Sequence, residues 1–198
     1  MKRLVLLCLL ASAAPAAWGQ YFETWFTGGE SLMAAGGLGS LTPIAGNKDD
    51  VELTNGHRFG FRVAFNGDRL IGHELFYTYN QTHIRYNQLT PIVEDSMAIH
   101  HFGYDMLLYA NHEGNRFRPF AAGGVQMANY VPPGSNAFYG GNLKFGVNYG
   151  GGLKVRVAGI WALRLDARQY LTPKPFDFPL KSGWLRQNEL SAGIGVVF

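Results

Sequence analysis

The sequence predicts an all-β fold, an eight-stranded antiparallel up-and-down β-barrel that crosses a membrane. Three observations lead to this prediction. Apolar and polar residues alternate with a period of two in eight segments, the connections between these segments are alternately long and short, and no apolar run in the mature chain is long enough for a membrane-spanning helix. Since open sheet edges cannot be left in lipid, strands that cross a membrane must close into a barrel.

Residues 1–19 have the pattern of a secretory signal peptide. Two basic residues precede a short apolar segment, small residues follow it, and we expect cleavage after Gly19, with Ala16 as the alternative site. The only cysteine, Cys8, lies in the apolar segment and lacks the small residue that a lipoprotein signal has before its cysteine. We therefore expect export without a lipid anchor, and residues 20–198 form one predicted outer-membrane β-barrel domain.

The mature chain is nearly neutral. Removing Lys2 and Arg3 from the 17 basic residues leaves 15 against 14 acidic ones, a net charge of +1. This balance gives no support to nucleic-acid binding, so we expect no nucleic-acid partner. Because the mature chain has no cysteine, it uses neither disulfides nor thiol chemistry in an oxidising compartment.

Eight segments carry the alternation that predicts strands. The clearest is residues 143–157, in which Phe145, Val147 and Tyr149 alternate with polar or small residues. No helical period, internal repeat or interdomain linker competes with this pattern. The other segments cover residues 21–36, 57–65, 69–80, 96–110, 116–130, 161–170 and 189–198.

The connections support the same assignment. Asn66-Gly67-Asp68 predicts a tight hairpin turn, because Asn-Gly supplies the positive φ that such a turn requires. Seven of the eight mature prolines lie in the long connections, as expected for a residue that cannot donate to a strand ladder. The long connections are residues 37–56, 81–95, 131–142 and 171–185, and the short ones are residues 66–68, 111–115 and 158–159.

Alternation alone does not say which face is inside, because a secreted soluble barrel would point Phe145 and Val147 at its core. Two features favour a membrane barrel with its polar face inside. The polar faces are rich in glycine, which makes room in a narrow lumen. Aromatic residues also gather near both strand ends, as at membrane interfaces: Phe65, Tyr109, Phe117, Trp161 and Phe198 at one end, and Tyr79, Tyr86, Tyr130, Tyr139 and Tyr170 at the other.

The C-terminal segment supplies a more specific pattern. Ser191, Gly193, Val196 and Phe198 form the order polar, glycine, hydrophobic, terminal aromatic. This order resembles the signal by which bacterial outer-membrane barrels are recognised by the barrel-assembly machinery. Together with the number of strands and the alternation of long and short connections, it makes the mature chain similar to the small outer-membrane β-barrel proteins related to the transmembrane domain of outer-membrane protein A.

The resemblance implies an integral membrane protein of the Gram-negative cell envelope, located in the bacterial outer membrane after signal-peptide export. Its partners would be outer membrane lipids and the barrel-assembly machinery. The periplasmic peptidoglycan-binding domain of outer-membrane protein A has no counterpart before Phe198, so we expect the barrel alone.

Deleting Phe198, or replacing it with a polar residue, is expected to lower insertion into the membrane while export continues. The reason is loss of the terminal aromatic group of the assembly signal. The measurement is the amount of folded, heat-modifiable barrel, and equal amounts from the truncated and full-length chains would argue against the signal.

Ten charged residues have the parity of the polar, inward face. Isolated charges could not be held inside, so we expect them to pair across the barrel. Because side chains nearly fill an eight-stranded lumen, a structural network is the favoured interpretation, and an ion pathway or an anion site is the alternative. The ten are Arg58, Arg62, Glu74, Asp105, Lys154, Arg156, Arg164, Asp166, Arg168 and Glu189, six cations and four anions.

One hairpin allows a finer prediction. Lys154 and Arg156 share the inward face of one strand, and Asp166 lies on the next strand beyond a two-residue turn. We expect these three residues to lie within reach of one another and of Arg164 and Arg168 across the hairpin, so that Asp166 is an anion surrounded by cations. Asp166→Ala should then destabilise the barrel far more than Asp49→Ala in the first long connection.

Catalysis and metal binding find no matching pattern. Small outer-membrane barrels that modify lipopolysaccharide use serine, histidine and acidic residues at the rim, but Asp95-Ser96, His57 and His100-His101 form no nucleophile–base arrangement. The histidines lack zinc-ligand spacing, and Asp49-Asp50 indicates a solvated loop. We therefore expect no catalytic, cofactor-binding or metal site.

Three functions remain open after these exclusions. The favoured one is a structural or surface-interaction barrel whose four long loops lie outside the cell and meet a ligand that the sequence does not identify. The alternatives are an enzyme that modifies outer-membrane lipid and a narrow ion channel.

Overall fold

A computed structural model describes residues 21–67, 70–135 and 140–198. The expected signal peptide and its cleavage sites lie outside these residues, as does Tyr139. Within the described ranges, no helix is both long and apolar enough to cross a membrane.

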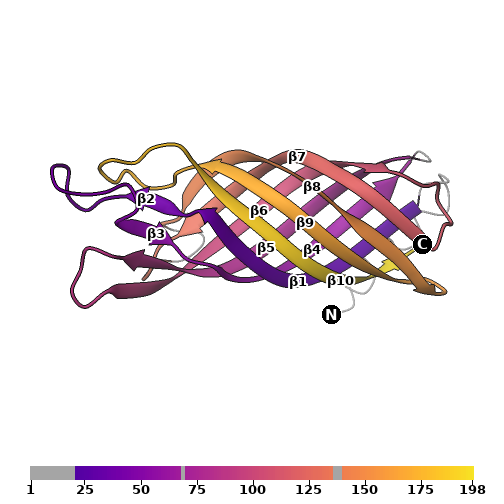
Figure 1. Ribbon diagram of the computed structural model, residues 1–198. Helices are drawn as coiled ribbons and strands as arrows, with labels where there is room; N and C mark the ends of the chain where they lie inside the picture. The colour runs from indigo at the N-terminus through magenta and orange to yellow at the C-terminus, as the bar shows by residue number, and fades with distance from the viewer. Residues whose placement is uncertain (1–20, 68–69, 136–139) are drawn as a thin grey trace.

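Eight long antiparallel strands close into a barrel (Figure 1). β1 pairs with β4 on one side and with β10 on the other, and β5 pairs with β6, so the eight long strands form a closed ring. This confirms the predicted eight-stranded barrel. The long strands are β1 (Tyr21–Ala35), β4 (Gly56–Asn66), β5 (Ile71–Tyr86), β6 (Val93–Tyr109), β7 (Phe117–Val131), β8 (Asn142–Ala158), β9 (Trp161–Pro173) and β10 (Trp184–Val197).

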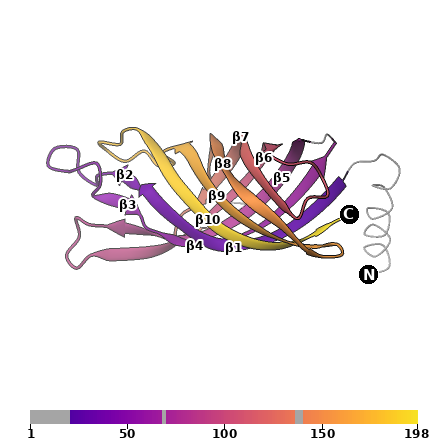
Figure 2. The same cartoon turned by 45° about the vertical axis from the view of Figure 1, so that its right-hand side comes forward.

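The two ends of the barrel differ. The loop end carries the long connections, and the short-turn end carries the tight turns and the C-terminus (Figure 2). The first long connection contains two short strands, β2 (Gly37–Gly39) and β3 (Val51–Leu53), and β3 pairs with the end of β5. The predicted long connection 37–56 thus contains two short strands, and the prediction that residues 81–95 form a connection was wrong. β5 and β6 leave only residues 87–92 between them.

Side chains alternate between lipid and lumen in the half of the barrel nearest the short turns. Phe61, Leu75 and Phe102 point outward and are exposed. Their neighbours Arg62 and Glu74 point inward and are fully buried. The apolar face is therefore outside and the polar face inside, as a barrel surrounded by lipid requires.

The polarity inverts toward the loop end. In β5, Leu75, Tyr77 and Tyr79 point outward, but beyond Tyr79 the outward residues Gln81 and His83 are polar and Ile84 is buried inside. Apolar groups face inward here because water, rather than lipid, surrounds this part of the barrel. They form the loop-end core: Leu38, Val51, Leu53, Ile84, Met97, Ile99, Ala128, Tyr130 and Leu185, with Met33, Tyr86, Phe176 and Phe178 packed against it.

Three predicted interface aromatics are buried inside the barrel instead, and a fourth, Tyr86, packs partly buried against the loop-end core. Tyr109, Tyr130 and Tyr170 are buried because each hydroxyl reaches a buried polar partner. Tyr109 donates to Oδ1 of Asn66 at 2.8 Å, and Tyr170 donates to Oε2 of Glu189 at 2.6 Å. The predicted aromatics that do face outward at the short-turn end are Phe65, Phe117, Trp161 and Phe198.

The first and last long connections meet over the barrel mouth. The backbone N–H of Ser40 donates to the carbonyl oxygen of Pro179 at 2.8 Å. Gly39 makes this approach possible: its φ is +137°, and a Cβ there would lie 2.5 Å from the Pro179 oxygen. The connections therefore cover the loop-end core.

Candidate functional site

A charge network fills the lumen between the short turns and the loop-end core. It consists of four arginines and four carboxylates: Arg58, Arg62, Arg164, Arg168, Glu74, Asp105, Asp166 and Glu189. All eight are buried. The alternation of β4, β5, β6, β9 and β10 places them inside, so the network joins five strands.

Glu74 is the most highly connected carboxylate. Its Oε1 accepts hydrogen bonds from Arg62 at 3.3 Å, Arg164 at 3.1 Å and Arg168 at 2.8 Å, and Oε2 accepts another from Arg164. Three guanidinium groups from two strands therefore converge on one side chain of β5. Charge-assisted bonds of this kind are about twice as strong as neutral ones.

The other carboxylates extend the network along β9 and β6. Asp166 accepts from Arg164 Nε at 2.7 Å and from Arg168 Nε at 3.1 Å. Asp105 accepts from Arg168 and from Asn148 Nδ2, the latter at 2.8 Å. Gly124 makes room for this layer, since a Cβ there would overlap the carbonyl oxygen of Tyr104 and lie 2.5 Å from Oδ1 of Asp105.

Glu189 connects the last strand to the same network. It accepts from Arg62 at 2.8 Å, from Tyr170 at 2.6 Å and from Ser191 at 2.7 Å, and its Oε2 lies 3.2 Å from Nε of Arg58. The Arg58 guanidinium also covers the Tyr170 ring, 4.2 Å from its centroid. The carboxylate is thus held from both β4 and β9.

The network closes the lumen at its level. Arg62, Glu74 and Arg164 each have 0% relative exposure. A water-filled pore would leave the side chains that line it in contact with solvent. The inward side chains are packed against one another instead, as expected for a barrel of this size.

Two of the ten predicted lumen residues lie outside this eight-residue network. Lys154 is buried near the short turns, where it donates to Glu23 and, at 2.6 Å, to the Tyr109 hydroxyl. Arg156 lies at the rim with 37% of its side chain exposed and is 3.6 Å from Glu113. The six cations and four anions of the prediction thus divide into a balanced four-to-four network and a separate pair near the rim.

The predicted contact of Lys154 and Arg156 with Asp166 was wrong. The strand register places Lys154 opposite Arg164, and it places Gly152 opposite Asp166. Asp166 therefore meets the two arginines of its own strand, while Lys154 lies nearer the short turns and meets Glu23 of β1. The strand ladder, rather than the shared face, decides which charges meet.

Sequence reasoning missed Glu23, Glu113 and Arg118. Glu23 is buried and shares its face with Trp25, an apolar residue that hides the alternation of β1. Arg118 is the second residue of β7, the strand with the weakest pattern, and Glu113 lies in a turn. The signal in the sequence was that the inward-facing Lys154 and Arg156 need acidic partners, and this requirement could have pointed to the two carboxylates.

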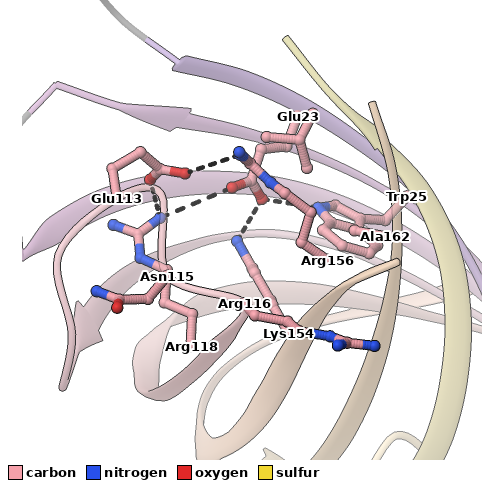
Figure 3. Close-up of a pocket in the computed structure, with 10 residues that line it drawn as sticks. Glu23, Trp25, Glu113, Asn115, Arg116, Arg118, Lys154, Arg156 and Ala162 are labelled. Atoms are coloured by element: carbon pink, nitrogen blue, oxygen red, sulfur yellow. Dashed lines mark hydrogen bonds and ion pairs between the residues drawn. The ribbon is translucent and has the colours of Figure 1, made fainter. Parts of the chain in front are cut away.

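These residues line the rim pocket at the short-turn end, a small opening with a cavity volume of about 20 Å³. Lys154, Arg118 and Arg156 reach toward the carboxylates of Glu23 and Glu113, whereas Arg116 points away (Figure 3). The other lining residues are Trp25, Asn115, Ala162 and Val197.

Burial raises the pKa of Glu113 above its ordinary value, against the attraction of Arg118, Lys154 and Arg156 and with the help of repulsion from Glu23. The folded protein therefore binds this proton more tightly than the unfolded chain does. The stability contributed by protonated Glu113 is fully present below the ordinary pKa and is lost as pH rises through the raised pKa.

Because the side chain of Glu113→Gln stays neutral, the free energy of unfolding of this variant is expected to depend less on pH. Compared with the unchanged protein, the variant should be more stable at neutral pH than at acid pH. Urea unfolding in lipid vesicles between about pH 4 and about pH 8 measures the difference between the variant and the unchanged protein. An identical pH profile for both would show that Glu113 titrates as it does in the unfolded chain.

The structure does not bring together the residues of the catalytic alternative. His100 points outward, with Nδ1 2.7 Å from the Tyr77 hydroxyl, whereas His101 is buried in the lumen and stacks on Tyr170. His57 is exposed at the loop end, with Nδ1 2.9 Å from Oε1 of Glu30. Among the described residues, no group of three or more His, Cys, Asp or Glu side chains is placed to hold a metal ion.

Comparison with known proteins agrees with this architecture. No curated protein sequence matches the chain. The structure is similar to that of neisserial surface protein A, with 13% identity, a TM-score of 0.56 and coverage of 91% of this chain and 97% of that one. It is also similar to the outer membrane protein OprG from Pseudomonas aeruginosa, with 10% identity, a TM-score of 0.58 and coverage of 89% and 95%. At such identities, these likenesses establish the fold alone.

The family assignment comes from the sequence match. The model of the outer membrane protein beta-barrel domain family matches residues 4–198, nearly the whole chain. Short turns lie on the periplasmic side in such barrels and long loops on the outer side. The chain therefore belongs to the outer membrane protein beta-barrel domain family and is a β-barrel protein of the bacterial outer membrane.

Proposed function

We propose that this protein is a non-conducting, non-enzymatic barrel with a structural and surface-interaction role. The proposal rests on one observation: side chains fill the interior of the barrel at two levels along its axis. The charge network fills the part within the membrane, and the loop-end core fills the part outside it. Such an interior leaves the outer surface of the loops as the place where the protein meets other molecules.

The loop connections support this role because they are fixed in place. Nε2 of Gln88 donates to Ser40 Oγ at 2.9 Å and to Asp50 Oδ2 at 2.6 Å, while its Oε1 accepts from the backbone of Leu41 at 3.0 Å. The backbone N–H of Asn87 donates to the Asp50 carbonyl at 2.8 Å. The first two long connections therefore form one unit. Because this unit is already ordered, it loses less conformational entropy when a partner binds.

This unit, the loop platform (residues 40–50 and 87–92), presents apolar groups to the outside. Ile44 is 96% exposed and Ile92 is 59% exposed, and Leu41 and Leu89 are each 40% exposed. Single exposed apolar residues are ordinary, but four on one hydrogen-bonded unit supply contact area for a partner. We infer that the platform is the interaction surface.

The membrane partners follow from the rest of the barrel. The outward apolar belt would contact outer membrane lipids, and the segment Ser191, Gly193, Val196 and Phe198 would be recognised by the barrel-assembly machinery. Phe198 lies beside Phe22 at 6.1 Å between ring centroids, so the same ring also packs against the first strand.

Two measurements separate the alternatives. Planar-bilayer recordings of the refolded protein should show no steady conductance, and a stable open level would favour the channel. Mass spectrometry of lipid A from cells with and without the gene should give identical spectra, and a gene-dependent modification would favour the enzyme.

The interaction role has its own test. Ile44→Asp should reduce the attachment of cells that display the protein to apolar surfaces, because it places a charge on the most exposed apolar residue of the platform. Ala45→Asp, an exposed neighbour that gains the same charge but loses little apolar area, is the matched control. Equal attachment by both variants and the unchanged protein would contradict the proposal.

A further inference from the structure

A groove lies on the lipid-facing surface where β8, β9, β10 and β1 run side by side (Figure 1). It has a volume of about 310 Å³. The small side chain of Ala167 forms its floor, between Leu190 on β10 and Gly151 on β8. The outward side chains that line it are Leu32, Tyr149, Ala167, Gln169, Asn188 and Leu190. The groove thus has an apolar floor and, toward the loop end, a polar margin.

The polar margin is a chain of hydrogen bonds that ends in a free donor. The Tyr149 hydroxyl donates to Oε1 of Gln169, and Nε2 of Gln169 donates to Oδ1 of Asn188 at 2.8 Å. In the described part of the chain, Nδ2 of Asn188 has no acceptor. An N–H group that faces lipid without a partner is costly, because lipid tails offer no acceptor. The Asn188 amide is therefore placed to donate to a ligand that carries an oxygen acceptor.

The outward face of β10 puts three kinds of chemical group in a fixed order beside this groove. From Phe198 to Leu190, the outward residues of this strand are apolar or small. Asn188 follows, and Arg186 comes next toward the loop end, each about 7 Å further along the strand. Asn188 therefore marks the edge of the apolar belt, and Arg186 lies just beyond it.

Arg186 is an exposed cation without a counter-charge. No described side chain forms an ion pair or a hydrogen bond with its guanidinium group. The outward carboxylate of the neighbouring strand β1 is Glu30, which pairs in register with Leu190, and its Oε1 lies 2.9 Å from Nδ1 of His57. Guanidinium groups suit phosphate because their planar donors match two of its oxygens. The end of the groove nearest the loops therefore favours a phosphate.

We propose that this groove is a binding site for one phosphorylated acyl lipid of the outer leaflet. The acyl chain lies over Ala167, its ester carbonyl accepts a hydrogen bond from Nδ2 of Asn188, and the phosphate pairs with Arg186. The order of these groups along β10 is their order in such a lipid, from the tail to the headgroup. The site goes beyond the general contact of the apolar belt with lipid, because it recognises three parts of one molecule. No covalent step is involved.

The test supplies the tail and the phosphate together and apart. Refolded protein in nonionic micelles is titrated with dihexanoyl phosphatidate, with dihexanoylglycerol, which lacks the phosphate, and with inorganic phosphate at matched ionic strength. Phosphatidate should shift both the side-chain amide resonance of Asn188 and the Nε–Hε resonance of Arg186. Dihexanoylglycerol should shift the Asn188 resonance alone, and inorganic phosphate should leave that resonance unmoved.

Two pairs of variants locate the lipid on the barrel. Arg186→Gln should weaken phosphatidate binding about tenfold, the loss expected for one charge-assisted hydrogen bond, and should leave dihexanoylglycerol binding unchanged. Arg116→Gln, which removes an exposed arginine at the short-turn end, is its matched control and should change neither. Ala167→Phe should weaken the binding of both lipids, because the new ring fills the groove. Leu75→Phe, which enlarges an outward side chain on the opposite side of the barrel, should not.

Equal shifts of the Asn188 resonance with phosphatidate and with inorganic phosphate would overturn the proposal, because a site for free phosphate needs no tail. Equal phosphatidate binding by Arg186→Gln and Arg116→Gln would also overturn it, as would equal binding by Ala167→Phe and Leu75→Phe. If a variant does not refold, the three titrations of the unchanged protein decide, and an Asn188 resonance that none of the ligands moves overturns the proposal.

Discussion

Glu74→Ala is expected to lower the free energy of unfolding of the barrel by about 3–5 kcal/mol, the cost of removing one partner from a buried ion pair. The loss falls in the upper part of this range because three guanidinium groups, those of Arg62, Arg164 and Arg168, donate to the same carboxylate. Arg62 and Arg164 have no contact with solvent that could compensate.

Urea unfolding in lipid vesicles measures this effect. Glu94→Ala is the matched control, since Glu94 also pairs with an arginine but lies exposed at the loop end, where an ion pair contributes less than about 1 kcal/mol. Unfolding of Glu74→Ala at the urea concentration of the unchanged protein would show that water reaches the network. Glu74→Gln, which keeps the size of the side chain, separates the loss of charge from the loss of packing.

Ile84→Asp is expected to open the loop end locally while the membrane part stays folded. Ile84 is 2% exposed within the loop-end core, so the new carboxylate would be buried without a partner at a cost of about 3–5 kcal/mol. A local cost of about 3 kcal/mol raises the open population on the order of a hundredfold.

Limited trypsin digestion at Arg85 measures that population, because this strand residue must separate from its neighbours to be cleaved. His83→Asp is the control: it introduces the same charge one residue away on the outward face, and its cleavage rate should stay near that of the unchanged protein. Equal rates for the two variants would mean that the loop end has no apolar interior.

The contrast between neighbouring residues explains where sequence reasoning succeeded. Within the membrane, outward residues such as Phe61 and Phe102 contact lipid and inward ones such as Arg62 contact the network, so a period of two identifies the strand and its faces. Seven of the eight strands were therefore predicted close to their observed starts. The exception is β10, which begins at Trp184, and its first residues lie at the loop end.

The extension of β5 beyond Asn80 was missed for a physical reason. In β5, Ile71, Leu75, Tyr77 and Tyr79 occupy odd positions on the outer face, whereas Ile84 faces inward at an even position, because the surroundings change from lipid to water. A rule that expects apolar residues at one parity along the whole strand places the end of the strand at this inversion. The same change hides the first residues of β6, where Met97 and Ile99 face inward.

The members of the charge network followed from parity, but their partners did not. Parity assigns a residue to the lumen without giving its height along the axis, and the height depends on the register of the whole barrel. Lys154 and Asp166 share a hairpin and the lumen, yet Lys154 meets Glu23 from the opposite end of the sequence. The role of Glu113 depends on how a turn folds, for which residues 111–115 carry no periodic signal.

The position of Glu189 on the last strand has a consequence for the order of events in assembly. Glu189 is the carboxylate that lies beside Arg58, and it shares Arg62 with Glu74. A sheet that lacks β10 therefore holds Arg58 without its counter-charge. Closure by β10 supplies the missing carboxylate together with the last strand pairings, so this ion pair stabilises the closed cylinder and none of the precursors that lack β10.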